Sequence, residues 1–140
     1  MSNGASADRD QAAGVLICDD NDGMRAMLGV ILGTSAGVRV VGEAADGNEA
    51  VVEATRLQPN VILLDLAMPN RSGLEALPEL RRVAPDAQVI VFSGFAGSAV
   101  AEQVIALGAV SYLEKGADPD TIVATIEQAL ASTPLSGLQA

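Results

Sequence analysis

The sequence predicts an α/β domain in which a parallel five-stranded sheet lies between two layers of helices. Short apolar runs alternate five times with segments of helical period, which is the pattern of repeated strand and helix units. The runs are apolar on both faces, as expected of parallel strands covered on both sides. A chain of 140 residues with 49% hydrophobic residues has the length of one domain and enough apolar side chains for one core.

The five predicted strands are aliphatic runs of strand length. They cover residues 14–18, 38–43, 61–64, 88–92 and 109–113. A membrane span needs about 18 to 20 consecutive apolar residues, so we expect no membrane-spanning segment.

The first three predicted helices each follow a strand. The apolar stripe of the first consists of Met24, Met27, Leu28, Ile31 and Leu32. The second covers about 46–57 and ends before Pro59, because the residue before a proline leaves the helical region. The third covers about 72–83, and its inward residues are Leu74, Leu77, Leu80 and Val83. Pro78 lies within the third helix and lacks a backbone donor, so we expect a kink or a later start.

The last two predicted helices complete the alternation. The fourth covers about 98–107 and ends at Gly108. In the fifth, Asp118 is the predicted N-cap and Pro119 the first helical residue. Its buried face consists of Ile122, Ile126 and either Ala129 or Leu130.

Outside the single domain at 14–131 we expect two flexible tails. Residues 1–13 form the first, and residues 132–140 form a second tail or the start of a linker. The first tail lacks the apolar stretch of a secretory signal, which predicts a cytoplasmic protein. With 8 basic and 18 acidic residues the formal net charge is −10, which argues against direct contact with nucleic acid. Cys18, the one cysteine, is expected to be a small buried hydrophobe.

Polar residues follow the ends of four predicted strands. Asp19 and Asp20 follow the first strand, Asp65 the third, Ser93 the fourth and Lys115 the fifth. Because ligands of open parallel sheets bind outside the carboxyl ends of the strands, we expect these side chains to share one crevice. Asp20 taken alone would be interpreted as a helix cap. The whole group indicates a site.

The residue types at these strand ends indicate phosphoryl chemistry. Clustered carboxylates repel one another unless a cation neutralises them, and oxygen ligands favour Mg²⁺. The absence of histidine and of a second cysteine argues against zinc. A metal, the Lys115 ammonium and the Ser93 hydroxyl together suit a phosphoryl group. Asp65 is then the candidate nucleophile, because it ends the most apolar strand.

Four motifs carry a resemblance to a known family. They are Cys18-Asp19-Asp20-Asn21, Leu63-Leu64-Asp65-Leu66-Ala67-Met68-Pro69 with Gly73, Val91-Phe92-Ser93-Gly94, and Tyr112-Leu113-Glu114-Lys115. Over about 14–131 the chain resembles the receiver domain of two-component response regulators. The resemblance implies a three-layer flavodoxin-like (βα)5 fold with strand order 2-1-3-4-5. It also implies a phosphorylation-activated signalling switch, which is not an enzyme beyond its own phosphorylation and slow autodephosphorylation.

The resemblance also implies the metal ligands. Asp65 would accept the phosphoryl group from a sensor histidine kinase. Asp20 and Asp65 would bind Mg²⁺ (or Mn²⁺) directly and Asp19 mostly through water. The backbone carbonyl of Ala67 would complete the protein ligands.

Further residues would act on the phosphate and on its lifetime. Lys115 would pair with Asp65 and then with the phosphate, Ser93 would hydrogen-bond the phosphate, and Tyr112 would rotate inward behind Ser93. Ala67 and Phe95 are the lifetime-tuning positions: Ala67 offers no group to position water, and Phe95 would partly cover the phosphate. We therefore expect an acyl phosphate of moderately long life.

The chain departs from the commonest family pattern at two loops. Gly116 follows Lys115 where proline is frequent, so no cis peptide is expected there. Gly94 replaces the usual alanine, and with Gly97 it predicts a freer loop. The Lys-Gly ending resembles receivers that often precede a DNA-binding domain, and no such domain is found in these 140 residues.

We expect signalling through protein partners. Upstream would be a sensor histidine kinase or a phosphotransfer protein. Downstream would be a partner protein or a second copy, bound by the face of the fourth helix, fifth strand and fifth helix. The candidates for exposure there are Ala99, Val100, Ala101 and Ala106.

Several alternatives remain open. The chain could be the excised N-terminal receiver of a larger DNA-binding regulator, or a phosphorelay shuttle. An aspartate-nucleophile phosphatase would need an acid at Ala67, and a flavin carrier would need more aromatic residues than the 2% present.

Overall fold

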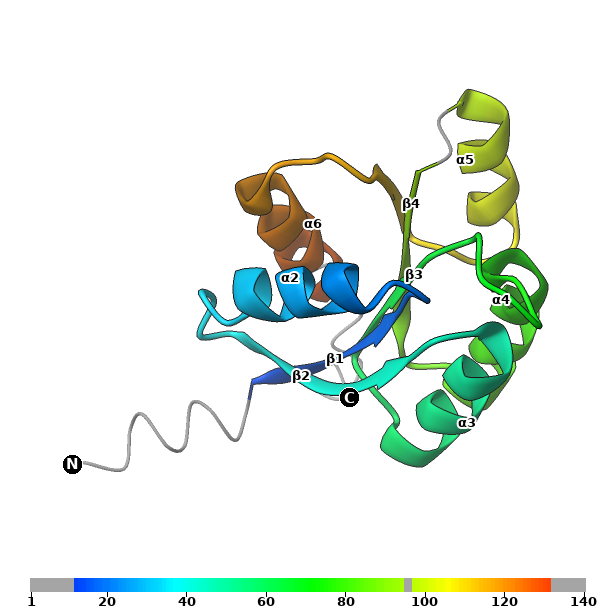
Figure 1. Ribbon diagram of the computed structural model, residues 1–140, viewed down its shortest axis with the longest axis horizontal. Helices are drawn as coiled ribbons and strands as arrows, with labels where there is room; N and C mark the ends of the chain where they lie inside the picture. The colour runs from blue at the N-terminus through cyan, green and yellow to red at the C-terminus, as the bar shows by residue number, and fades with distance from the viewer. Residues whose placement is uncertain (1–11, 95–96, 132–140) are drawn as a thin grey trace, which may run out of the picture.

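The computed structural model describes residues 12–94 and 97–131. Five parallel strands form one sheet in the order β2-β1-β3-β4-β5, with helices on both faces (Figure 1). The strands are β1 (Ala13–Cys18), β2 (Val38–Ala44), β3 (Val61–Leu64), β4 (Gln88–Ser93) and β5 (Ser111–Glu114). The helices are α2 (Asp22–Leu32), α3 (Gly47–Leu57), α4 (Gly73–Val83), α5 (Ser98–Ala106) and α6 (Pro119–Ala131). The predicted fold class and strand order are confirmed.

The core lies in two layers, one on each face of the sheet. Alternate residues of β1 point to opposite faces: Val15 and Ile17 pack with α2 and α6, whereas Leu16 and Cys18 pack with α3, α4 and α5. Figure 1 shows α2 and α6 on one side of the strands and the other three helices on the opposite side. Cys18 is buried as predicted, and burial, with a smaller effect of Asp19, raises the pKa of its thiol.

The strand predictions hold to within two residues. The largest difference is at β5, which begins at Ser111 where the pattern predicted residue 109. Ala109 instead donates its N–H to the carbonyl of Val104 and closes the end of α5. Val110 already bonds the carbonyl of Val89, so the chain joins the sheet just before β5 begins.

Two helix predictions need correction. In α2, Met27 was expected in the buried stripe but is 43% exposed, because it lies at the edge of a face centred on Leu28 and Leu32. In α4, of the two expected effects of Pro78 the later start does not occur, and the kink stays a prediction. The helix runs without a break through Pro78, which is exposed, and Ser72 and Glu75 form a capping box at its start.

The last helix agrees with the sequence in cap and buried face. Asp118 accepts a hydrogen bond from the N–H of Thr121 at 2.8 Å, and Ile122, Ile126 and Ala129 are buried. Across 12–94 and 97–131, the helices are too short or too polar for any to cross a membrane.

Candidate functional site

The ends of β1 and β3 bring two buried carboxylates together. Cys18 pairs with Leu64 in the parallel register, so Asp19 and Asp65 follow neighbouring strands. The N–H of Asp65 donates to the carbonyl of Cys18 at 2.9 Å, and both aspartates are buried. The strand register therefore places them at the same edge.

The ends of β4 and β5 contribute the hydroxyl and the ammonium. Ser93 pairs with Glu114, and the N–H of Lys115 donates to the carbonyl of Ser93 at 2.8 Å. Ser93 is completely buried. The residues predicted to share a crevice thus all follow neighbouring strands at the carboxyl edge.

Three carboxylates and one ammonium form the centre of this edge. Asp19, Asp20 and Asp65 each offer an oxygen, and these atoms lie within 4.8 Å of one another. The Nζ of Lys115 lies 2.7 Å from Oδ2 of Asp19 and 3.1 Å from Oδ2 of Asp65. Lys115 therefore joins the two buried carboxylates, while the exposed Asp20 closes the cluster towards solvent.

The electrostatics follow from burial and from these contacts. Burial raises the pKa of Asp65, and the nearby Asp19 raises it further, while Lys115 opposes the shift. Burial lowers the pKa of Lys115, but its contacts with Asp19 and Asp65 outweigh burial and leave it raised. One ammonium thus neutralises only part of a negative cluster, so the site favours a second cation.

The cluster has the donors that a hard divalent cation requires. The available ligand atoms are carboxylate oxygens, which Mg²⁺ prefers. Beyond its ion pair with Lys115, the buried Oδ2 of Asp19 has no hydrogen-bond partner among the described residues, and a buried acceptor usually has its partners satisfied. These residues therefore fit a magnesium ion.

Two residues of this edge were not singled out as site residues from sequence. Asn21 is the N-cap of α2, where its side chain accepts from the N–H of Met24 at 2.8 Å. Asparagine is a common N-cap residue, so this role could have been predicted from the residue type. The helix cap considered for Asp20 is in fact its neighbour Asn21. Arg25 bonds the carbonyl of Asp19 and the side chain of Glu43. No local motif signals contacts between such separated residues.

Ala67 contacts the candidate nucleophile through its backbone. Its N–H donates to Oδ1 of Asp65 at 3.3 Å, and the residue is exposed. The role of its carbonyl as a metal ligand stays a prediction.

Tyr112 is half-buried on β5 and packs against the core beneath α5. Its hydroxyl is buried and makes no hydrogen bond to the described residues. Burial, then the charge of Glu114, raises the pKa of the phenol. An ordinary strand tyrosine would keep its hydroxyl in water, so an unpartnered buried hydroxyl marks this position as distinctive.

The loop predictions have different outcomes. Phe95, the second predicted lifetime-tuning residue, lies outside the described residues. Gly97 has φ +136° and Gly116 has φ +107°, both in the region that favours glycine. No cis peptide occurs in the described chain, as expected after Lys115.

The predicted partner face is only partly exposed as expected. Ala99 and Ala106 are exposed, whereas Val100 and Ala101 are half-buried. Larger apolar side chains are exposed beside them, namely Ile105 (47%), Leu107 (36%) and Val110 (44%). We call these three residues the α5 patch. They were missed from sequence because Ala99, Val100, Ala101 and Ala106 were taken as the exposed apolar residues of this face.

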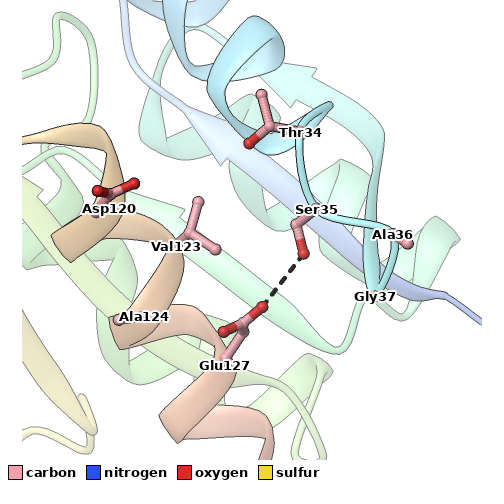
Figure 2. A pocket seen from close by; sticks show the side chains of 8 residues that line it. All are labelled: Thr34, Ser35, Ala36, Gly37, Asp120, Val123, Ala124 and Glu127. Atoms are coloured by element: carbon pink, nitrogen blue, oxygen red, sulfur yellow. Dashed lines mark hydrogen bonds between the residues drawn. The ribbon is translucent and has the colours of Figure 1, made fainter.

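A hollow of about 610 Å³ lies elsewhere, between α6 and the loop that joins α2 to β2 (Figure 2). It is lined by Thr34, Ser35, Ala36, Gly37, Asp120, Val123, Ala124 and Glu127. Ser35 donates to Glu127 across it at 3.4 Å. None of the acidic-cluster residues lines this hollow, so it is separate from the candidate site.

Comparison with known proteins identifies relatives along most of the chain. The family model described as response regulator receiver domain matches residues 15–127. The chemotaxis protein CheY of Thermotoga maritima is 36% identical over 114 residues, which cover 81% of this chain and 94% of CheY. The transcriptional regulatory protein LiaR of Bacillus subtilis is 37% identical over 120 residues, or 86% of this chain and 57% of LiaR. The chain therefore spans nearly all of one relative and little more than half of the other.

Solved structures agree with these matches. The CheX-CheY-BeF3-Mg complex from Borrelia burgdorferi contains a chain with TM-score 0.78 and 26% identity, covering 83% of this chain and 87% of that one. A response regulator from Burkholderia pseudomallei, solved with a phosphorylated aspartic acid and a calcium ion, has TM-score 0.73 and 31% identity, covering 86% and 75%. With this fold, these strand-end residues and this sequence match, the chain belongs to the response regulator receiver domain family.

Proposed function

We propose that this chain is a phosphorylation-activated signalling switch that accepts a phosphoryl group on Asp65 in the presence of Mg²⁺. The observation that carries the proposal is the position of Lys115, whose Nζ lies against both Asp19 and Asp65 in a three-carboxylate cluster. A nucleophile, a cation site and a fixed ammonium together are the parts that phosphoryl transfer needs.

The transfer forms one bond to phosphorus and breaks another. A carboxylate oxygen of Asp65 bonds to the phosphorus of a phosphohistidine on a sensor kinase. The P–N bond breaks, its electron pair stays on the imidazole nitrogen, and solvent protonates that ring as needed. Lys115 faces the incoming negative charge from the side of Asp65, and Ser93 hydrogen-bonds a phosphoryl oxygen. Tyr112 then turns inward behind Ser93.

Mg²⁺ would neutralise phosphoryl oxygens as charge redistributes during transfer. Asp20 and Asp65 would hold it directly, Asp19 mostly through water, and Ala67 through its carbonyl. The Mg²⁺ in the complex of the Borrelia CheY supports a divalent cation in this chain, and the phosphorylated aspartic acid of the Burkholderia relative supports an aspartyl phosphate.

Ala67 and Phe95 set the lifetime of the acyl phosphate in this proposal. The methyl group of Ala67 has no polar atom with which to orient an attacking water, and Phe95 shields the phosphate. Dephosphorylation by the chain itself is therefore slow, and beyond these reactions the chain is a signalling protein.

The output is a partner or a second copy of this chain, bound by the face of α5, β5 and α6. Residues 14–131, together with Ala13, which already belongs to β1, form the signalling unit, and it acts in the cytoplasm where its kinase is phosphorylated. The matched residues cover only 57% of LiaR, a transcriptional regulatory protein. This partial coverage favours a second candidate, in which this receiver precedes a DNA-binding domain. A phosphorelay shuttle would use the same site residues.

Intact-mass measurement after incubation with acetyl phosphate tests the proposal. The wild type should gain one phosphoryl group with Mg²⁺ and none without it, and Asp65→Asn should gain none. Asp86→Asn is the matched control, because Asp86 is exposed in the turn before β4, and it should behave as wild type. An adduct that persists in Asp65→Asn, or that forms equally without Mg²⁺, would contradict the proposal.

A further inference from the structure

Arg25 lies beside the acidic cluster and joins three segments. It belongs to the first turns of α2, and its side chain is only 15% exposed. Nε donates to Oε1 of Glu43 on β2 at 2.8 Å, Nη1 donates to the carbonyl oxygen of Asp19 at 2.5 Å, and Nη2 donates to Asp22. The guanidinium therefore connects the end of β1, the start of α2 and the end of β2.

The bonded carbonyl belongs to the peptide that links Asp19 to Asp20. A peptide unit is planar, so fixing its oxygen fixes the direction in which the chain continues to Asp20. The preceding peptide is held as well, since the N–H of Asp19 donates to the carbonyl of Ala44 at 2.9 Å. Oδ1 of Asp19 accepts from the N–H of Asn21 at 2.9 Å. Backbone and side-chain bonds thus fix the segment that carries two of the three carboxylates.

The charge of Arg25 is balanced away from the cluster. Asp22 and Glu43 form ion pairs with the guanidinium, while its hydrogen bond to Asp19 is made to the carbonyl oxygen and not to the carboxylate. Arg25 therefore orients the ligands without competing with a cation for them. These bonds come from three nitrogens held in one rigid plane, whereas the three donors of a lysine ammonium all sit on a single nitrogen and cannot reach the same three acceptors.

We propose that Arg25 is a positioning residue, which holds the peptide between Asp19 and Asp20 so that both carboxylates face one metal ion. The proposal rests on the proposed function in one respect, namely that the acidic cluster binds Mg²⁺. Residues that orient metal ligands typically change metal affinity by about 10- to 100-fold when they are replaced.

The test compares Arg25→Met and Arg25→Lys with the wild type, at a temperature where all are folded. Mn²⁺ binding is measured by electron paramagnetic resonance, with Mg²⁺ competition. Both variants should bind about tenfold more weakly. Arg81→Met is the matched control, because Arg81 also donates to a backbone carbonyl, that of Ala87 before β4, at 2.6 Å. It should lose stability but keep its metal affinity within about twofold of wild type.

Hydrogen exchange without metal gives a second readout. The backbone N–H of Asn21 donates to Asp19. It should exchange faster in both Arg25 variants than in the wild type, and its exchange rate should be unchanged in Arg81→Met. Should Arg25→Met fail to fold, Arg25→Lys and Glu43→Gln carry the test, since Glu43→Gln keeps an oxygen acceptor for Nε and should give a smaller loss.

Three outcomes would overturn the proposal. Wild-type affinity in Arg25→Lys would mean that charge alone matters. A lower melting temperature with unchanged metal affinity in Arg25→Met would mean a purely structural role, and unchanged Asn21 exchange would mean that the peptide is not held by Arg25. If the wild type itself bound no metal, the proposed function would fail instead, while the exchange result would still decide whether Arg25 holds this peptide.

Discussion

Gly73 lies directly against the backbone of Asp65, the proposed phosphoacceptor. It begins α4, and its N–H donates to the carbonyl of Leu66 at 3.0 Å. A Cβ at this position would stand 2.0 Å from the carbonyl oxygen of Asp65 and 2.9 Å from its carbonyl carbon. The absence of a side chain therefore lets α4 start directly against the backbone of Asp65.

Gly73→Ala should destabilise the protein because the Asp65 backbone or the start of α4 must move. Overpacking of this kind costs about 1–3 kcal/mol. Gly29→Ala is the control: Gly29 lies within α2, and beyond its chain neighbours and the backbone of its own helix a methyl group added there would meet no atom within 4 Å, so the substitution should stabilise by up to about 1 kcal/mol. Urea unfolding measures both, and equal effects of the two substitutions would contradict this expectation.

At the residue scale, the sequence predicted the members of the cluster but not what holds them. Asp19, Asp65 and Lys115 were predictable because each follows a strand, and parallel strands share one carboxyl edge. The bond from Arg25 to the Asp19 carbonyl and the burial of the Tyr112 hydroxyl depend on side-chain directions. No residue spacing encodes those directions.

At the scale of elements, the start of α3 is tied to the loop that follows Asp65. Asp46 caps α3 by accepting from the N–H of Glu49 at 2.8 Å, and its other oxygen accepts from Asn70 at 2.9 Å. The N–H of Gly47 donates to the carbonyl of Arg71 at 2.8 Å. One helix terminus therefore fixes the segment that leads from β3 to α4.

Asp46→Ala should lower the melting temperature by roughly 5 °C, because a cap and a contact between loops are lost together. The hydrogen bond from Asn70, then that from Glu49, lowers the pKa of Asp46 below its ordinary 3.8. The folded protein thus favours the charged form more than the unfolded chain does. The stabilisation is complete well above pH 3.8 and is lost as the pH falls through the lowered value.

The difference in unfolding free energy between wild type and Asp46→Ala should therefore be larger at about pH 7 than at about pH 2. Urea titrations at the two values measure it, with Asp86→Asn as an exposed control whose effect should stay small. A difference that is the same at both pH values would show that the charge of Asp46 contributes nothing.

The elements themselves were largely predictable because hydrophobic period is a local property. All five strands and five helices occur where the pattern placed them. The errors lie where tertiary contacts decide: Met27 is exposed at the edge of its stripe, and the start of β5 depends on how the end of α5 is closed. The tolerance of α4 for Pro78 likewise depends on its exposed position and on the capping box at Ser72.

At the scale of the whole molecule, the acidic cluster and the α5 patch are built from different residues and differ in charge. The net charge is −10, and three carboxylates gather at the carboxyl edge of the sheet. Glu102 is the one charged residue of α5, and the α5 patch lies on this helix and the turn to β5. A negatively charged phosphoryl donor thus needs cations to approach the acidic cluster. An apolar partner surface can approach the α5 patch without burying a charge.

The α5 patch should mediate self-association once the acidic cluster carries a phosphoryl mimic. With beryllofluoride and Mg²⁺, sedimentation equilibrium should give a larger mass for the wild type. Ile105→Glu should weaken that association by at least about tenfold, because a buried charge would face apolar surface. Val52→Glu is the control, since Val52 is 61% exposed on α3, and it should associate as the wild type does. An unchanged mass of the wild type would exclude self-association under these conditions and leave a different protein as the partner. Equal loss in both variants would mean that added negative charge, and not the α5 patch, controls association.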